Sequence, residues 1–192
     1  MNIFEHFEAD GSWTLFLDRD GVINRLREND YVKKWEEFVF IPGTLQAIQY
    51  FTKVFGRICV VTNQQGVGKG LMTAADLETI HSKMLSEIES VGGRIDKIYA
   101  CPDLANNNPP CRKPEIGMGL QAKEDFPEID VSRSIMVGDS VKDMEFAERL
   151  GIHRFFVNGR IDKFELNITY PEITNLSSLA SYMKEHVHSG EQ

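Results

Sequence analysis

Residues 14–22 read TLFLDRDGV, a short and mostly apolar run that passes directly into an acidic turn. The stretch at 14–18 predicts a β-strand, and RICVVTN at 57–63 predicts a second strand that also ends in polar residues. Short apolar runs of this kind are typical of strands covered on both faces, as in a parallel sheet. We therefore expect a buried sheet whose strand ends carry polar side chains.

Longer amphipathic stretches alternate with the apolar runs. Further strands are expected at 97–101, 134–139 and 153–158, and helices at 44–55, 73–91, 117–125, 142–150 and 177–188. Thr73 is a candidate N-cap, and Gly151 is a candidate helix stop. This alternation predicts an α/β fold with a Rossmann-like open, mainly parallel sheet and helices on both faces.

Length and charge narrow the classes of function. The 192 residues suit a single domain spanning 1–192, with residues 1–12 as an N-terminal extension and no large cap domain. The net charge of −8 argues against nucleic acid as a partner, although a local basic pocket for an anion is compatible with it. No signal peptide and no membrane-spanning run are visible in the sequence, so we expect a cytoplasmic monomer without a membrane partner.

The chain contains three cysteines, Cys59, Cys101 and Cys111. A low and odd number argues against a disulfide framework and favours a reducing compartment. Cys59 lies inside an apolar strand and is expected to be buried and unreactive.

Acidic side chains follow the first strand, at the sheet edge where open parallel sheets bind ligands. Asp18 and Asp20 point the same way on an extended segment. Two close carboxylates repel, so they require a proton or a cation, and Mg²⁺ prefers such oxygen ligands. Taken alone, the motif is equally compatible with a solvated turn.

Two polar clusters lie further along the chain. Thr62, Asn63 and Gln64 follow the second strand and offer donors for the oxygens of an anion. Arg112 and Lys113 place two adjacent cations in an acidic chain, where they could hold a phosphate. The plain alternative for both clusters is a solvated turn.

A fourth cluster follows the fourth strand. Asp139 stands at the strand end, where it could complete a metal site. Asp143 lies one helical turn later, where an acid also stabilises a helix N-terminus without any further function. Each cluster is modest alone, but their shared placement after strands favours a functional site.

These clusters resemble the motifs of a known family. The segments DRDGV (18–22), VVTNQ (60–64), CRKP (111–114) and VGDSVKD (137–143) resemble the haloacid dehalogenase superfamily of phosphatases. More narrowly, FLDRDGVIN (16–24), the stretch 31–43, VVTNQQGVGKG (60–70) and CRKP are similar to the D,D-heptose 1,7-bisphosphate phosphatases, to which the histidinol-phosphate phosphatases are related.

The resemblance implies roles for the acidic residues. Asp18 would be the nucleophile that forms an aspartyl-phosphate, and Asp20 would protonate the leaving alcohol and then activate water. Mg²⁺ would be held by Asp18, the backbone carbonyl of Asp20, and Asp139. Asp143 is expected to support this site from behind.

The resemblance also implies a phosphate site. Thr62 and Lys113 would hold the phosphoryl oxygens. Asn63, Gln64 and Arg112 would shape the substrate end, with Arg112 a candidate for a second phosphate. The expected partner is thus a phosphorylated small molecule, most simply a sugar phosphate.

The chain departs from this family at its zinc loop, which reads Cys-x-His and then Cys-x-Cys before Arg-Lys-Pro. Cys101 and Cys111 are present, but Asp103 replaces the histidine and Pro109 replaces the third ligand. Because zinc takes four ligands, Zn²⁺ is not expected here, and the prolines could restrict the loop instead.

The resemblance, together with these observations, implies a Mg²⁺-dependent phosphomonoester hydrolase, with the C7 phosphate of D-glycero-D-manno-heptose 1,7-bisphosphate as the leading substrate. Histidinol phosphate is one alternative, and a polynucleotide 3′-phosphate is disfavoured by the charge of −8. A catalytically idle module that binds phosphorylated ligands is the alternative of another class, because a fold does not determine a function.

Overall fold

A computed structural model describes residues 10–157 and 171–186. Within these ranges six parallel strands form one sheet in the order β3-β2-β1-β4-β5-β6. The strands are β1 (Thr14–Leu17), β2 (Arg57–Asn63), β3 (Lys97–Cys101), β4 (Ser134–Gly138), β5 (His153–Val157) and β6 (Glu172–Ile173). The predicted parallel sheet is confirmed. Strand β6 was not predicted, because a strand of two residues is too short to give a recognisable sequence pattern.

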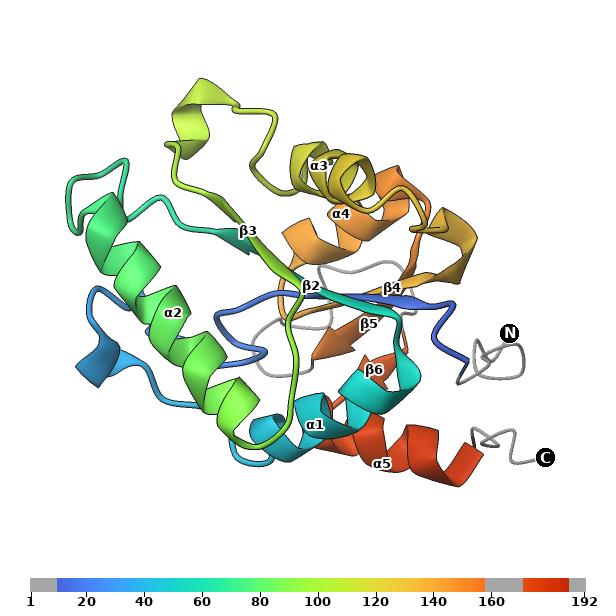
Figure 1. Cartoon of the computed structure of the whole chain (residues 1–192). Coiled ribbons are helices and arrows are strands. Elements are labelled where there is room, and N and C mark those ends of the chain that lie inside the picture. Colours follow the sequence, from blue (N-terminus) through green and yellow to red (C-terminus); the bar gives the residue numbers. More distant parts are fainter. Residues whose placement is uncertain (1–9, 158–170, 187–192) are drawn as a thin grey trace.

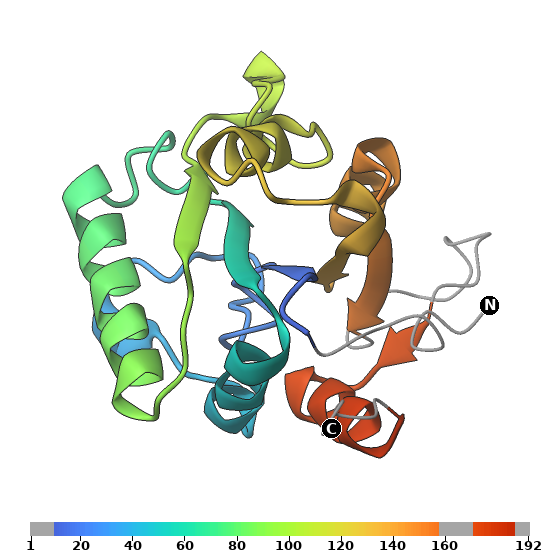
Figure 2. The same ribbon diagram turned by 45° about the vertical axis from the view of Figure 1, so that its right-hand side comes forward.

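Helices cover both faces of this sheet, as predicted. They are α1 (Thr44–Val54), α2 (Ala74–Ser90), α3 (Gly117–Asp125), α4 (Val141–Leu150) and α5 (Leu176–His186). Helices α1, α2 and α5 lie on one face, and α3 and α4 lie on the other (Figure 1, Figure 2). The predicted ends at residues 158 and 187–188, and residues 1–9 of the predicted N-terminal extension, lie outside the described residues.

Strand β1 joins the two layers because its side chains alternate between them. Leu15 and Leu17 belong to the apolar cluster under α1, α2 and α5, whereas Phe16 belongs to the cluster under α3 and α4. All four residues of β1 are buried. The central strand therefore holds its carboxyl end, where Asp18 follows, in a fixed place between two packed layers.

Local sequence signals set the helix ends. The Thr73 hydroxyl accepts a hydrogen bond from the Asp76 N–H, and the Asp76 side chain caps Thr73 in return, which confirms the predicted N-cap of α2. Gly151 ends α4 in the left-handed conformation that glycine favours. None of the helices in the described ranges combines the length and apolar character that crossing a membrane requires.

Gly21 allows the turn after β1 to pass close to the end of β4. Its φ is +89°, and a Cβ atom at this position would lie 1.9 Å from Oδ2 of Asp139. Gly70 has a similar φ of +68° but no atom within 4 Å of its hypothetical Cβ. A side chain at Gly70 would therefore bring only the cost of the left-handed backbone, whereas one at Gly21 would add a steric clash with Asp139.

We expect Gly21→Ala to destabilise the protein much more than Gly70→Ala. The Gly70 variant should lose about 1–2 kcal/mol of unfolding free energy, the cost of placing a Cβ in a left-handed conformation. The Gly21 variant should lose more, because Asp139 must also move. Urea unfolding of both variants measures the difference, and equal losses would contradict the close packing of Gly21 against Asp139.

Candidate active site

A cavity of about 200 Å³ opens at the carboxyl edge of the sheet, beside the segment 26–32. Its lining includes six sequence-predicted site residues, namely Asp18, Asp20, Thr62, Asn63, Lys113 and Asp139. Asp143, expected only as support, also lines it, whereas Gln64 and Arg112 are not among its lining residues. The structure thus brings together polar side chains from the ends of β1, β2 and β4, the start of α4 and the loop after β3.

Lys113 forms the electrostatic centre of the cavity. Its ammonium group is buried and lies 2.7 Å from the carbonyl oxygen of Val61, 2.8 Å from Oδ1 of Asp18 and 2.5 Å from Oδ1 of Asp143. An ammonium group carries three N–H donors, so these three acceptors match its full capacity. A phosphate oxygen that binds Lys113 would have to share or replace one of them.

Asp18 and Lys113 perturb each other's protonation. Burial raises the pKa of Asp18 to about 7, and the negative charges of Asp143 and Asp20 add to this, against the attraction of Lys113. Burial alone would lower the pKa of Lys113, but Asp143 and Asp18 reverse the effect and raise it to about 12. Lys113 is therefore charged at neutral pH, and Asp18 requires further positive charge to be fully ionised.

Three buried carboxylates could supply oxygen ligands for a cation. One oxygen from each of Asp18, Asp139 and Asp143 lies within 4.8 Å of the others. Asp143 also caps α4, because its Oδ2 accepts hydrogen bonds from the N–H and hydroxyl of Ser140 at 3.1 and 2.6 Å. This donor set fits a hard divalent cation such as Mg²⁺.

Asp20 lies in a different environment from Asp18. Its two oxygens accept bonds from Arg19 Nη2 at 3.0 and 2.9 Å, from the Asn24 amide at 2.8 Å and from the Gln64 amide at 2.8 Å. Burial alone would raise the pKa of Asp20, but Arg19 and the amide hydrogen bonds hold it below its usual value. Gln64 also donates to the Thr62 hydroxyl. Although Gln64 does not line the cavity, it therefore fixes the side chains of Asp20 and Thr62, which do.

Asn63 fixes the backbone of Lys113. Its Oδ1 accepts the Lys113 N–H at 3.0 Å, and its amide donates to the Lys113 carbonyl at 3.1 Å. Asn63 pairs in register with Cys101 on β3. The loop that leaves β3 at Cys101 therefore reaches Lys113 close to the carboxyl end of β3.

This return brings Cys101 and Cys111 together, and the structure joins them in a disulfide with a Cα–Cα distance of 5.4 Å. The sequence argument against a disulfide framework did not anticipate this single bridge, because spacing alone does not reveal that the loop closes on itself. The Asp103 carboxylate lies 3.7 Å from the Cys111 sulfur. Within the described ranges Cys101, Asp103 and Cys111 could offer a metal three ligands only with this disulfide reduced, and the expectation about zinc stays a prediction.

The rim of the cavity contains residues that the sequence analysis did not name individually. Arg27, Asp30 and Tyr31 line it, and Arg27 donates to Asp30 at 3.0 Å. The Tyr31 hydroxyl accepts a hydrogen bond from Gln65 at 2.9 Å, which ties the segment after β1 to the turn after β2. Buried Nη1 of Arg112 has no hydrogen-bond partner among the described residues, and burial lowers the Arg112 pKa.

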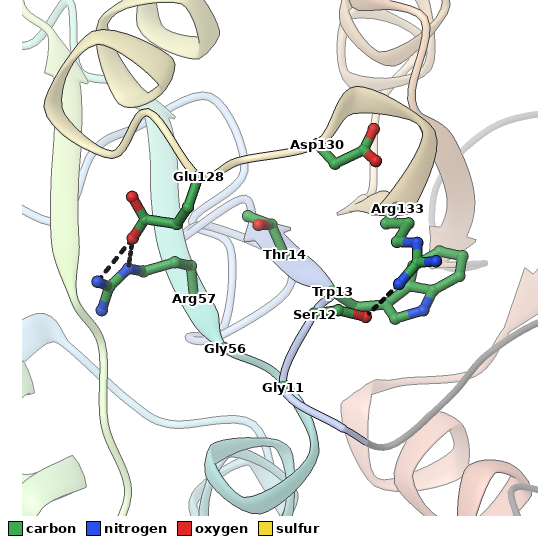
Figure 3. A pocket seen from close by; sticks show the side chains of 9 residues that line it. All are labelled: Gly11, Ser12, Trp13, Thr14, Gly56, Arg57, Glu128, Asp130 and Arg133. Carbon is green, nitrogen blue, oxygen red and sulfur yellow. Dashed lines mark hydrogen bonds and ion pairs between the residues drawn. The ribbon is translucent and has the colours of Figure 1, made fainter.

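A larger cavity of about 490 Å³ lies at the opposite edge of the sheet, by the starts of β1 and β2 (Figure 3). Both arginines of its lining already have partners in the wall: Arg57 pairs with Glu128 at 2.7 Å, and Arg133 donates to Ser12 at 2.9 Å. The concentration of buried carboxylates around a buried cation occurs at the carboxyl edge instead, so we assign the candidate site there.

Replacing Lys113 should destabilise the fold far more than replacing a surface lysine. Lys113→Met leaves Asp18 and Asp143 without their counter-charge, and breaking a buried pair costs about 3–5 kcal/mol. Lys97 is the matched control, because it pairs with Asp125 at 2.8 Å at the surface, and such pairs contribute about 0–1 kcal/mol. Denaturant unfolding measures both losses, and a Lys113→Met loss no larger than that of Lys97→Met would contradict this view of the centre.

The Asp18 carboxyl should also affect how the stability of the metal-free protein depends on pH. The folded state retains the Asp18 proton up to about pH 7, whereas the unfolded state releases it near 3.8, so this group lowers stability as pH rises through that window. In EDTA, the stability of Asp18→Asn relative to that of the wild type should therefore increase as the pH rises from about 4 to about 7. Urea unfolding at both pH values tests this, and parallel pH profiles would contradict the raised pKa.

Comparison with known proteins extends these observations. Residues 13–161 match the model of a protein family described as polynucleotide kinase 3 phosphatase. A D-glycero-alpha-D-manno-heptose-1,7-bisphosphate 7-phosphatase from Mycobacterium bovis is 42% identical over 142 residues, which is 74% of this chain and 75% of the relative. A D-glycero-beta-D-manno-heptose-1,7-bisphosphate 7-phosphatase from Bordetella bronchiseptica is 36% identical and covers 76% of this chain and 82% of its own length.

Solved structures agree with the sequence relatives. The crystal structure of a D,D-heptose 1,7-bisphosphate phosphatase from B. bronchiseptica, complexed with magnesium and phosphate, superposes with a TM-score of 0.83 at 31% identity. The superposition covers 90% of this chain and 98% of that one.

Proposed function

The chain belongs to the polynucleotide kinase 3 phosphatase family of haloacid dehalogenase-like phosphatases. From this membership and the similarity to heptose bisphosphate phosphatases, we propose that it is a Mg²⁺-dependent hydrolase of D-glycero-D-manno-heptose 1,7-bisphosphate. The phosphate removed would be the one on C7. The observation that carries this proposal is the buried cluster of Asp18, Asp139 and Asp143, two of which pair with Lys113, at the sheet edge that also presents Thr62 and Asp20.

Mg²⁺ would be held by Asp18, Asp139 and the backbone carbonyl of Asp20, and Asp143, which pairs with Lys113, would support the site. The bound ion would offset the negative charge of the transferred phosphoryl group. The fit rests on the donor set, because three carboxylates lie close together, Asp18 and Asp143 share Lys113, and the raised pKa of Asp18 marks a need for more positive charge. A magnesium complex of a relative with the same fold supports the choice of ion.

The first half of the reaction transfers the phosphoryl group to the protein. A carboxylate oxygen of Asp18 attacks phosphorus, and the bond from phosphorus to the C7 oxygen breaks. Asp20 gives its proton to the departing oxygen, which leaves as the sugar alcohol. Thr62 and Lys113 orient the phosphoryl oxygens, since both line the cavity beside Asp18.

The second half returns the protein to its starting state. Water attacks the phosphorus of the aspartyl-phosphate while Asp20 takes up a proton, and inorganic phosphate leaves with the Asp18 carboxylate restored. The environment of Asp20 supports this part of the cycle, because Arg19, Asn24 and Gln64 all donate to its ionised form.

The sugar substrate is supported by the relatives, which are named for heptose 1,7-bisphosphate phosphatases of both anomers. A polynucleotide 3′-phosphate has the support of the family description alone, and the net charge of −8 opposes the binding of a nucleic acid strand. We expect the active protein to be a monomer and to work in the cytoplasm.

Asp18→Asn should abolish turnover of the preferred substrate, with at least about a thousandfold loss, because the amide oxygen is a poor nucleophile. Phosphate release is measured with Mg²⁺ on the alpha and beta heptose 1,7-bisphosphates, histidinol phosphate and a 3′-phosphorylated oligonucleotide. Asp103→Asn is the matched control, since Asp103 is an acid of the neighbouring loop and not of the cavity lining.

The outcomes distinguish the hypotheses. Preference for one heptose anomer, lost in Asp18→Asn and kept in Asp103→Asn, supports the proposal. Preference for the oligonucleotide or for histidinol phosphate keeps the chemistry and replaces the substrate. Full activity in Asp18→Asn, or no Mg²⁺-dependent release from any substrate, overturns the mechanism.

A further inference from the structure

Arg19 lies between the two aspartates of the first motif, and its guanidinium is fully buried. Its Nη2 donates to both oxygens of Asp20, and its Nη1 lies 3.1 Å from Nε2 of His81 on α2. Nε of Arg19 has no hydrogen-bond partner among the described residues. The described hydrogen bonds of the guanidinium group therefore lead to Asp20 on one side and to His81 on the other.

We propose that His81 is a positioning residue for the hydrolysis, because it fixes the Arg19 guanidinium and, through it, the Asp20 carboxylate. This inference rests on the proposed function, in which Asp20 exchanges protons with the leaving group and with water. His81 lies on a helix outside the cavity lining and does not need to touch the substrate.

The direction of the hydrogen bond follows from the chemistry of the two side chains. Arginine can only donate, so Nε2 of His81 must accept, and the ring must be neutral with its proton on Nδ1. Burial, helped by the charge of Arg19, lowers the pKa of His81 to about 4. His81 therefore stays a neutral acceptor across the pH range in which most cytoplasmic enzymes work.

The geometry explains why a second contact matters. A guanidinium group held only by Asp20 could turn about that pair, and the carboxylate would turn with it. The contact with His81 removes this freedom, because it fixes a second nitrogen of the same planar group. Asn24 and Gln64 then meet the Asp20 oxygens in one orientation. Small errors in the orientation of a proton-transfer group cost rate.

The alternative is that His81 only fills space, since Ile80, Met84 and Ile88 of the same helix are also buried. The two views differ in what they predict for substrates with different leaving groups. A sugar alkoxide needs a proton from Asp20 as it leaves, whereas p-nitrophenolate leaves without one. Loss of Asp20 positioning should therefore harm the first substrate selectively, and loss of packing should harm both alike.

The experiment measures kcat/KM, which covers the steps up to departure of the leaving group. His81→Leu should lower kcat/KM for the best sugar phosphate by about 10–100-fold, and for p-nitrophenyl phosphate by less than about 3-fold. His81→Gln should restore most of the activity, because its amide oxygen can accept the bond from Arg19. Met84→Leu is the packing control on the same buried face and should change neither value.

Equal losses on both substrates, or a Gln variant as impaired as the Leu variant at the same melting temperature, overturn the inference while the proposed function stands. If the wild type shows no Asp18-dependent hydrolysis of either substrate, both the inference and the proposed function are overturned. If His81→Leu does not fold, His81→Asn replaces it, because its shorter side chain cannot reach Arg19. A His81→Asn variant as active as His81→Gln would then contradict the proposal.

Discussion

The burial of the Lys113 ammonium group is the constraint on which the site depends. A buried cation without partners is too costly to persist, so the structure must bring acceptors to it. They come from the carbonyl of Val61 in β2, the end of β1 at Asp18 and the first turn of α4 at Asp143. Asn63 holds the backbone of the same lysine, so one residue links the strand ends, the loop from β3 and a helix start.

This arrangement gives two aspartates of one motif opposite properties. Asp18 is buried among carboxylates and has a raised pKa, whereas Asp20 is surrounded by donors and has a lowered one. Such a separation is typical of sites in which two similar groups perform different steps. The cause is local: the side chain of Arg19, between them in the sequence, bonds to Asp20 and leaves Asp18 to Lys113.

The sequence predicted the sheet and helices well, because uninterrupted apolar runs and capping residues such as Thr73 are local signals. It also indicated the strand-end residues, since all carboxyl ends of a parallel sheet share one edge. It could not place His81, whose role depends on where α2 lies relative to Arg19. For the same reason it did not predict the contact of Tyr31 with Gln65 or the central position of Asp143, and it did not foresee that Cys101 and Cys111 meet across a closed loop.

The two oxygens of Asp143 have a consequence for the dynamics of the molecule. One completes the cap of α4 with Ser140, and the other pairs with Lys113. Helix ends usually fray because opening a first turn exposes only a few backbone groups to water. Here the same opening would leave the buried Lys113 without one of its carboxylate partners, so the first turn of α4 can open only together with the loop that carries Lys113. We therefore expect these segments to open as one cooperative unit, so that slow amide exchange extends to a helix terminus where rapid exchange is the rule.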